Sequence, residues 1–375
     1  MNARIFLSPP WMGGGEQERV REAFASNYVA PTGPMVDRFE ARFSERVGIP
    51  NVCALSSGTA GLDLLFRELG VGRGDTVICS DLTFVASIAP AVHAGAEPVF
   101  VDCEAATWTM DTERLAEALA EADRSGRRPK AVVAVDLYGQ CCDYDGLEAL
   151  CARHGVPLIV DAAEALGARY GDRAAGDAGW AAVYSFNGNK IITTSGGGMV
   201  ASRQADVIAR ARKRSQQSRE AAAWYEHREL GYNYRLSNIC AAIGVGQLAH
   251  LDTILARKRS IAAFYRERLR EIAAITWMPE APYGESNHWL SILQLDPRQT
   301  AVTPEQVRLA LEAENIESRP VWKPMHAQPV FAGAKCYGGA VSERLFRQGL
   351  CLPSGAGLAE ADLERVAAVV HACLK

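Results

Sequence analysis

The chain has 375 residues, of which 48% are hydrophobic and 22% are charged, and its formal net charge is −4. This length suits one large domain with a smaller one, and the near-neutral charge predicts neither a nucleic-acid partner nor attraction to an anionic membrane. The sequence lacks a signal peptide and any run of about 20 apolar residues, so we expect a cytoplasmic protein without a membrane span. The ten cysteines include no C-x-x-C pair, so we predict reduced thiols and no metal site.

Short strand-like runs alternate with helical periods over the first half of the chain. The expected strands cover residues 52–56, 76–79, 98–102, 131–137, 158–161 and 181–186. Between them, residues 61–69 carry apolar side chains at helical spacing, with Gly70 as a stop signal. This alternation is typical of an α/β protein with a mostly parallel sheet and helices on both faces. Three glycines at 196–198 predict a turn into a further strand.

The second half predicts a different architecture. Residues of about 236–270 are rich in Ala, Leu and Arg and predict one long helix. It would lead into a smaller C-terminal α+β domain with strands at 289–295 and 316–321 and helices near 304–313 and 359–374. We therefore divide the chain into a large domain, 1–245, and a small domain, 246–375.

Two of the expected strands end in residues that suit one kind of cofactor chemistry. Asp161 ends the strand 158–161, and Ser185 and Lys190 follow from the strand 181–186. Ligands of open α/β sheets bind outside the carboxyl ends of the strands. A lysine that forms a Schiff base and an aspartate that keeps a pyridine nitrogen protonated are what pyridoxal 5′-phosphate requires. As alternatives, Asp161 is a helix N-cap and Lys190 is a surface lysine.

A phosphate site and a ring-stacking residue are also candidates. The sequence Ser57-Gly58-Thr59-Ala60 joins the first expected strand to a helix, where backbone N–H groups and the helix dipole favour an anion. The alternative is a simple helix cap. Phe84, after the next strand, either stacks on a planar ring or packs into the core.

These motifs resemble, in family order, the nucleotide-sugar aminotransferases of the DegT family, which are fold-type I pyridoxal phosphate enzymes. The matching segments are 57–60, 83–84, 135–139, 161–167, 185–190, 196–198, 231–236 and 325–328. Segments 7–14 and 26–31 look most like the bacterial 4-aminotransferases of bacillosamine biosynthesis, a pathway that serves protein glycosylation. Those enzymes aminate a UDP-linked 4-keto-6-deoxy-N-acetyl sugar with glutamate as donor.

The resemblance implies a role for each cofactor-site residue. Lys190 would be the catalytic residue, which carries the cofactor and moves a proton between it and the sugar C4. The implied cofactor-binding residues are Gly58, Thr59, Phe84, Asp161, Glu164, Ser185, Lys190 and, from the second subunit of a homodimer, Asn233. Glu164 departs from the family pattern, because many relatives have Gln or His there, near the cofactor hydroxyl.

The resemblance also implies substrate contacts. The loop Asn27-Tyr28-Val29-Ala30 would cover the nucleotide sugar, and a plain surface loop is the alternative. Arg235 is the candidate for the diphosphate, because a guanidinium fork matches phosphate oxygens. Further candidate substrate residues are Tyr184, Trp322, Lys323, Met325, His326, Ala327 and Gln328. His326 is equally well a buried structural histidine.

Other functions remain open at this point. A pyridoxal phosphate-dependent sugar dehydratase would have histidine in place of Lys190. A catalytically silent sensor would keep the fold without need of both Asp161 and Lys190. A nicotinamide-dependent oxidoreductase would need a G-x-G-x-x-G fingerprint, which is absent from the sequence. Two further alternatives also remain open: the amine is added at C3 instead of C4, or the substrate is another nucleotide keto-sugar.

Overall fold

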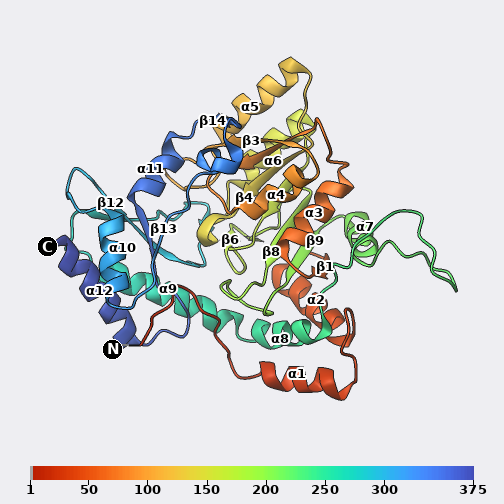
Figure 1. The fold of residues 1–375 in the computed structure, drawn as a ribbon, viewed down its shortest axis with the longest axis horizontal. Helices are drawn as coiled ribbons and strands as arrows, with labels where there is room; N and C mark the ends of the chain where they lie inside the picture. Colours follow the sequence, from red (N-terminus) through yellow and green to blue (C-terminus); the bar gives the residue numbers. More distant parts are fainter. Residues whose placement is uncertain (1–2) are drawn as a thin grey trace.

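The computed structural model describes residues 3–375 (Figure 1). Its main layer is an eight-stranded sheet in the order β1-β9-β8-β5-β4-β2-β3-β14. The strands are β1 (Asn51–Leu55), β2 (Thr76–Ser80), β3 (Glu97–Val101), β4 (Ala131–Val135), β5 (Leu158–Asp161), β8 (Ala181–Ser185), β9 (Gly198–Ser202) and β14 (Lys335–Tyr337). Only β9 runs antiparallel to its neighbours within this sheet. The prediction of a mostly parallel sheet is confirmed.

Both faces of the large sheet are covered, which is why its central strands are apolar throughout. Every residue of β4 is buried, and alternate side chains enter two different cores: Val132 one and Val133 the other. The helices around this sheet are α2 (Pro34–Val47), α3 (Gly58–Glu68), α4 (Ala89–His93), α5 (Thr112–Ser125), α6 (Tyr144–His154) and α7 (Ala205–Ser215). A 3-10 turn, η1 (Val85–Ser87), follows β2, and η2 (Leu137–Gly139) follows β4.

The predicted long helix over 236–270 is wrong, because the chain bends by 63° between α8 (Asn238–Leu248) and α9 (Leu251–Arg268). His250 has a non-helical backbone at the bend, and its ring packs edge-on against Trp11. Contact with the N-terminal segment, which continues into α1 (Glu16–Ala25), thus accompanies the break. Within residues 3–375, no single helix is long and apolar enough to cross a membrane; α8 and α9 meet that test only as a bent pair.

The C-terminal part forms a small antiparallel sheet in the order β10-β12-β15-β13. Its strands are β10 (Ile275–Trp277), β12 (Ser291–Leu295), β13 (Arg319–Pro320) and β15 (Gly349–Leu352), and its helices are α10 (Pro304–Ala313), α11 (Ala340–Gln348) and α12 (Glu360–Leu374). The remaining elements are β6 (Arg169–Tyr170), β7 (Arg173–Ala174), β11 (Gly284–Glu285), η3 (Met325–Ala327) and η4 (Pro329–Phe331). The predicted large-plus-small architecture is confirmed, although the strand expected at 316–321 shrinks to the two residues of β13.

Two connections cross the predicted domain boundary. Strand β14 leaves the C-terminal part and pairs with β3 at the edge of the large sheet. At the other end of the chain, Ile5 pairs with Ile316 beside the small sheet. A division near residue 245 therefore stays a prediction.

An arm projects from the large domain after α7 (Figure 1). We define it as residues 216–235. Backbone hydrogen bonds tie its two ends together, from Gln217 to Tyr232 and from Tyr234 to Ser215. Three large apolar side chains on the arm, Trp224, Tyr225 and Leu230, are between 66% and 93% exposed.

Candidate active site

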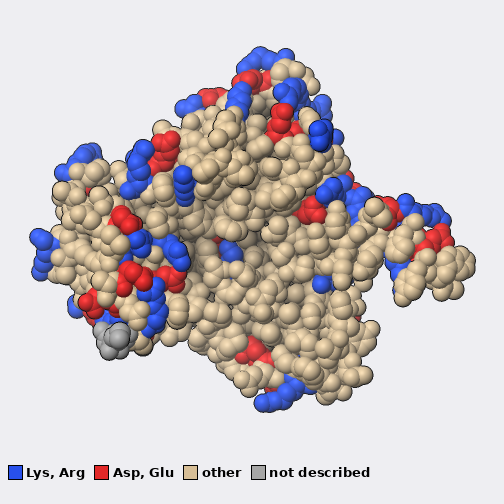
Figure 2. Space-filling model, in the orientation of Figure 1, with Lys and Arg blue, Asp and Glu red and all other residues tan. Residues whose placement is uncertain are grey.

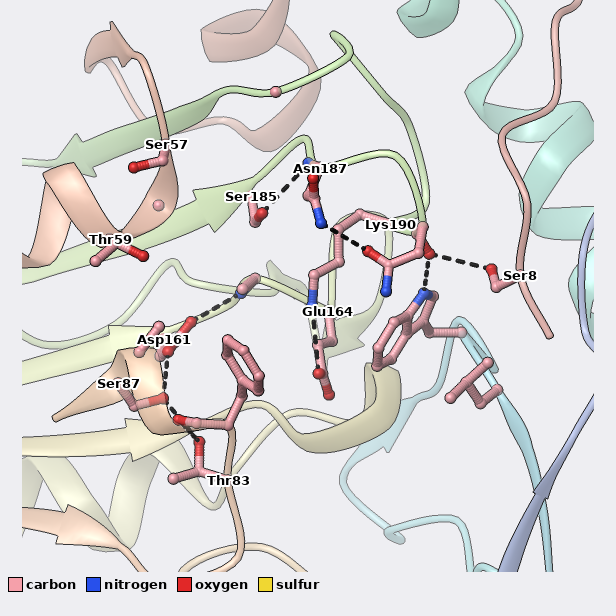
Figure 3. Close-up of a pocket in the computed structure, with 18 of the residues that line it drawn as sticks. Ser8, Ser57, Thr59, Thr83, Ser87, Asp161, Glu164, Ser185, Asn187 and Lys190 are labelled. Carbon is pink, nitrogen blue, oxygen red and sulfur yellow. Dashed lines mark hydrogen bonds and ion pairs between the residues drawn. The ribbon is translucent and has the colours of Figure 1, made fainter. Parts of the chain in front are cut away.

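A cavity of about 790 Å³ opens at the carboxyl ends of the large sheet. Strands β5 and β8 deliver Asp161 and Ser185 to it, and the loops that follow β1 and β2 deliver Ser57 and Phe84. These four strands run in the same direction, so their carboxyl ends meet at one edge of the sheet. Figure 2 shows this face hollowed near its middle, and Figure 3 shows the cavity residues in close-up.

Asp161 is buried at the end of β5 and lines the cavity. Its Oδ2 accepts a hydrogen bond from Ser87 Oγ at 2.7 Å, and its Oδ1 accepts one from the Ala163 amide at 3.1 Å. Ser87 also contacts Thr83 Oγ1 at 2.7 Å, so linked hydroxyls fix the carboxylate (Figure 3). A turn rather than a helix follows β5, so Asp161 is not an N-cap. Burial raises the pKa of Asp161 despite these bonds, and a cation placed beside it would oppose that rise by stabilising the charged carboxylate.

Lys190 places its amine inside the same cavity. Its Nζ lies 3.4 Å from Glu164 Oε1 and 4.3 Å from the centre of the Trp289 ring. Only 12% of the lysine side chain is exposed, which excludes the alternative of an ordinary surface lysine. Glu164 is buried, its Oε2 accepts a hydrogen bond from the Tyr138 amide, and burial raises its pKa to about 7 against the pull of Lys190. The cavity thus holds a nucleophilic amine beside a carboxyl that exchanges protons near neutrality.

The N-terminus of α3 forms a third part of the cavity. Ser57 caps the helix by accepting a hydrogen bond from the Ala60 amide at 3.0 Å, and Gly58 and Thr59 line the cavity beside it. A side chain on Gly198 would lie 2.4 Å from the Gly58 nitrogen, so only glycine lets β9 pack against this helix start. First-turn N–H groups lack intrahelical acceptors, and the helix dipole favours anions. The segment therefore both caps the helix and fits a phosphate.

Aromatic side chains form another wall. Phe84 is 57% exposed, and its ring lies 5.7 Å from that of Trp322, so its alternative as a core residue is wrong. The indole N–H of Trp289 donates to the Asn189 carbonyl at 2.7 Å, which holds this ring under the Lys190 amine. A planar ligand between Asp161 and Lys190 would have aromatic faces within reach.

The N-terminal segment also lines the cavity, and sequence reasoning gave it no cavity role from its residue types. Residues 6–10 contribute to the wall, and Ser8 Oγ donates to the Asn189 carbonyl at 3.1 Å (Figure 3). Glu317 and Arg319, near β13, line the cavity as well. None of these residues follows a strand of the large sheet, which is where the sequence places the other cavity residues, although Glu317 and Arg319 fall within the strand predicted at 316–321. The resemblance of segment 7–14 to one subgroup was the only available signal.

Several predicted substrate residues lie outside this cavity. The prediction for Tyr184 needs correction, because its ring is 1% exposed, packs against Phe43 and donates to the Ala175 carbonyl at 2.6 Å. It lies on the face of β8 that points into the core. Met325 is likewise a core residue. Among the described residues 3–375, Trp322 is the one residue of the predicted segment 322–328 that lines the cavity.

His326 adopts its structural alternative. Its Nδ1 lies 2.7 Å from Asp81 Oδ2 and its Nε2 lies 3.2 Å from Glu343 Oε1. Burial opposes its positive charge, but the two carboxylates outweigh this and raise the pKa of His326. Cys336 approaches this pair closely enough to offer a third metal-ligand atom. Asp81, however, already accepts hydrogen bonds from His326 and from Ser342.

A second group of predicted residues gathers around another hollow of about 570 Å³. Its lining includes Asn233 and Arg235, from the base of the arm, and Pro31 and Thr32, which follow the predicted substrate loop. Tyr28 and Val29 of that loop are about half exposed, so the loop lies on the surface. The two groups of predicted residues are thus separate within one chain.

Arg235 does not offer a free guanidinium to either hollow. Its Nη1 lies 2.8 Å from Glu40 Oε1, donates to the Ala54 carbonyl at 2.8 Å and contacts Cys53 Sγ at 2.9 Å. Only 3% of its side chain is exposed. The role predicted for Arg235 on a diphosphate therefore needs correction, because its guanidinium is buried and is held by Glu40, a carboxylate that it shares with Arg212.

The cavity residues fit pyridoxal 5′-phosphate on their own chemistry. The helix start suits the phosphate, the buried Asp161 carboxylate suits a protonated ring nitrogen, and the Lys190 amine suits the aldehyde. The fold and the site together define a pyridoxal phosphate-dependent enzyme with the aminotransferase fold.

Comparison with known proteins narrows this class. Residues 11–371 match the DegT/DnrJ/EryC1/StrS aminotransferase family, and the chain belongs to that family. It is 46% identical over 374 residues to EpsN of Bacillus subtilis (strain 168), a protein named as a pyridoxal phosphate-dependent aminotransferase. The matched region covers 99% of this chain and 96% of EpsN. It is 36% identical over 372 residues to the GDP-perosamine synthase of Caulobacter vibrioides, with 99% and 98% covered.

The solved structures agree. The structure of DesI in the presence of its TDP-sugar product superposes with a TM-score of 0.91 at 29% identity and covers 100% of this chain and 94% of that one. The protein is therefore a pyridoxal phosphate-dependent sugar aminotransferase of the DegT family. The predicted cofactor and enzyme class are confirmed.

Proposed function

We propose that the enzyme transfers the amino group of L-glutamate to C4 of a UDP-linked 4-keto-6-deoxy-N-acetylhexosamine. The observation that carries the transfer chemistry is the Lys190 amine in one cavity with the buried Asp161 carboxylate and the α3 N-terminus. The choice of sugar rests on the subgroup resemblance of segments 7–14 and 26–31.

Each cavity residue has a defined task in this proposal. When bound, pyridoxal phosphate supplies an electron sink for transamination. Lys190 Nζ would hold the cofactor and would move the proton between the two carbons. Asp161 would keep the ring nitrogen of the cofactor protonated, and Ser87 and Ala163 hold its carboxylate in place. Glu164 lies 3.4 Å from the amine and would orient it.

A direct experiment would test the acceptor. The purified enzyme is incubated with L-glutamate and, separately, with UDP-, GDP- and TDP-linked 4-keto-6-deoxy sugars, and the products are determined by NMR. We expect a new C4 amine on the UDP-linked N-acetyl sugar. A C3 amine, or turnover of only another nucleotide, would contradict the proposal.

A second candidate acceptor is a GDP-linked 4-keto-6-deoxyhexose. The similarity to GDP-perosamine synthase over nearly the full length favours it. The nucleotide panel separates the two, because a GDP-perosamine synthase-like enzyme would prefer the GDP-linked sugar. A catalytically silent sensor would give no amine with any of them.

We also propose that the active site is completed by a second copy of the chain. Asn233 and the loop 27–30 belong to the predicted site, yet they lie at or beside the second hollow rather than in the Lys190 cavity. The arm that carries Asn233 exposes Trp224, Tyr225 and Leu230, a pattern typical of a surface that another protein covers. A two-fold dimer would place the arm of one chain at the cavity of the other.

Mixed dimers test this arrangement. Lys190→Ala and Asn233→Ala chains should each be impaired, and verified heterodimers should regain activity because one of the two sites then has both native residues. Heterodimers that are no more active than the parent variants would refute sharing. An exclusively monomeric active enzyme in sedimentation would do the same.

A further inference from the structure

The cavity contains few positive charges for a site that must accept anionic substrates. Among the described residues that line it, the cations are Lys190 and Arg319, whereas Asp161, Glu164 and Glu317 are acidic. The helix start provides for the cofactor phosphate but not for a second anion. Both substrates in the proposed function are anions, because glutamate carries carboxylates and the sugar nucleotide carries a diphosphate. Within one chain, Arg319 is thus the cation left for a substrate anion once Lys190 is assigned to the cofactor, since Arg235 is buried and paired with Glu40.

Arg319 is placed and oriented to meet that need. It begins β13, which pairs with β15, so a strand of the small sheet fixes its backbone. Its Nε and Nη2 both donate to Glu317 Oε1, at 3.2 and 3.0 Å. Within residues 3–375, the Nη1 of Arg319 has no hydrogen-bond acceptor. Since 68% of the side chain is exposed, the guanidinium has an edge available to a ligand.

Glu317 orients this arginine and at the same time anchors the cavity wall. Its Oε2 accepts a hydrogen bond from the Leu7 amide at 3.1 Å, next to the N-terminal residues that line the cavity. An exposed ion pair of this kind contributes little stability by itself. The arrangement thus holds Arg319 at the cavity without consuming its full hydrogen-bonding capacity.

We infer that Arg319 binds the anionic group of a substrate at the Lys190 cavity. The group is either a carboxylate of the amino donor or the diphosphate of the sugar nucleotide, and this inference rests on the proposed function. Glu317 is a positioning residue for Arg319, and its own negative charge opposes the ligand.

The test uses the cofactor-loaded enzyme and measures its two half-reactions separately. L-Glutamate alone reports the donor half-reaction through the change in cofactor absorbance. The second half-reaction, of the aminated enzyme with the keto-sugar nucleotide, reports the acceptor half. Arg319→Ala should raise the apparent KM about 10- to 100-fold in one half-reaction, the range for a lost charge-assisted bond. A rise in the donor half identifies the carboxylate, and a rise in the acceptor half identifies the diphosphate.

A binding measurement keeps the inference independent of turnover. Titration calorimetry with UDP and with succinate, a dicarboxylate, compares the wild type with the variants at low and high salt. If the wild type binds an anion but aminates no keto-sugar, the proposed function fails while the role of Arg319 is still measured. Weaker binding in Arg319→Ala, with partial recovery in Arg319→Lys, is the expected result.

Two further variants separate ligand binding from a structural role. Arg298 is a matched control because it is also an exposed arginine paired with an acid two residues earlier, Asp296, but it lies outside the cavity lining. Arg298→Ala should change nothing. Glu317→Gln should weaken anion binding less than Arg319→Ala does, because it keeps the cation and loses only one of the two acceptors that hold Leu7 and orient Arg319. Equal weakening in Glu317→Gln and Arg319→Ala would indicate a structural pair, and unchanged affinities in Arg319→Ala for both anions would overturn the inference.

Discussion

The Lys190 cavity and the hollow beside Asn233 hold residues that the sequence assigns to one active site, yet the two regions are built differently. The cavity lies where parallel strands end, and its charged side chains face an open space. The hollow lies between loops, and the most buried charge near it, Arg235, is already paired with Glu40. The difference shows that a cation placed in the site by a sequence motif need not reach a ligand: Lys190 faces the open cavity, whereas Arg235 is buried and held by Glu40. The predictions below follow from that distinction.

The largest effect should come from Lys190. We expect Lys190→Ala to lower kcat by a factor of at least about 10²–10⁴, the usual contribution of a proton-transferring group, with no change in circular dichroism. Lys130, a half-exposed lysine of the same domain, is the matched control, and Lys130→Ala should retain wild-type kcat. Near-normal transamination in the Lys190 variant would show that catalysis does not depend on the Lys190 cavity, and would contradict the assignment of the active site to that region.

Asp161→Asn should have the next largest effect on catalysis. An opposite charge shifts the pKa of its partner by about 1–3 units, so we expect a loss of about 10- to 1,000-fold in kcat. Cofactor affinity should fall much less, because the phosphate is held by the α3 N-terminus. The two quantities are measured by steady-state kinetics and by absorbance titration with pyridoxal phosphate. A wild-type rate with the cofactor fully bound would exclude Asp161 as the ring partner.

In the second region we expect an effect on stability. Arg235→Ala leaves Glu40 buried but still paired with Arg212, so we expect a loss of stability smaller than the value of about 3–5 kcal/mol for a buried charge left without any partner. Urea denaturation should show this loss, whereas the apparent KM for the nucleotide sugar should stay within about twofold in the folded fraction. Arg228, an exposed arginine of the arm, is the control. A stable variant with a raised KM would restore the diphosphate role of Arg235.

The smallest effect concerns a support of the Lys190 cavity. Lys258 is 2% exposed and donates to the carbonyls of Trp289 and Ser354 at 3.0 and 2.9 Å. Burial lowers its pKa to about 7, whereas in the unfolded chain it stays near 10.5. Between these values the unfolded state binds the extra proton, so stability should rise with pH by up to about 1.4 kcal/mol per unit above pH 7.

Denaturation at pH 7, 8 and 9 measures that slope, and Lys258→Met should remove it. The difference between wild type and variant cancels other groups that titrate in this range. The same slope in both proteins would show that Lys258 does not titrate there.

The sequence predicted the parts of the site that depend on strand ends. Asp161 and Ser185 could be placed because apolar runs and their polar last residues are local patterns. Lys190 followed from its distance after such a run. The bend at His250 could not be predicted, because it accompanies contact with Trp11, far away in the chain. The burial of Tyr184 and the pairing of Arg235 were hidden for the same reason, since each depends on which distant residue packs against the side chain. Arg319 was missed because the strand predicted at 316–321 belongs to the small sheet, and the site was argued from the strand ends of the large sheet.

The two crossings between the lobes limit how such an enzyme can be recombined. The Ile5–Ile316 pair joins the first residues of the chain to the small lobe, and β14 returns from that lobe to complete the large sheet beside β3. A chimera that exchanges residues 246–375 with a relative would replace one partner in each of these contacts while leaving the other native. A chimera that keeps both contacts native must therefore exchange the N-terminal residues together with the small lobe. It must also leave β14 with the large lobe.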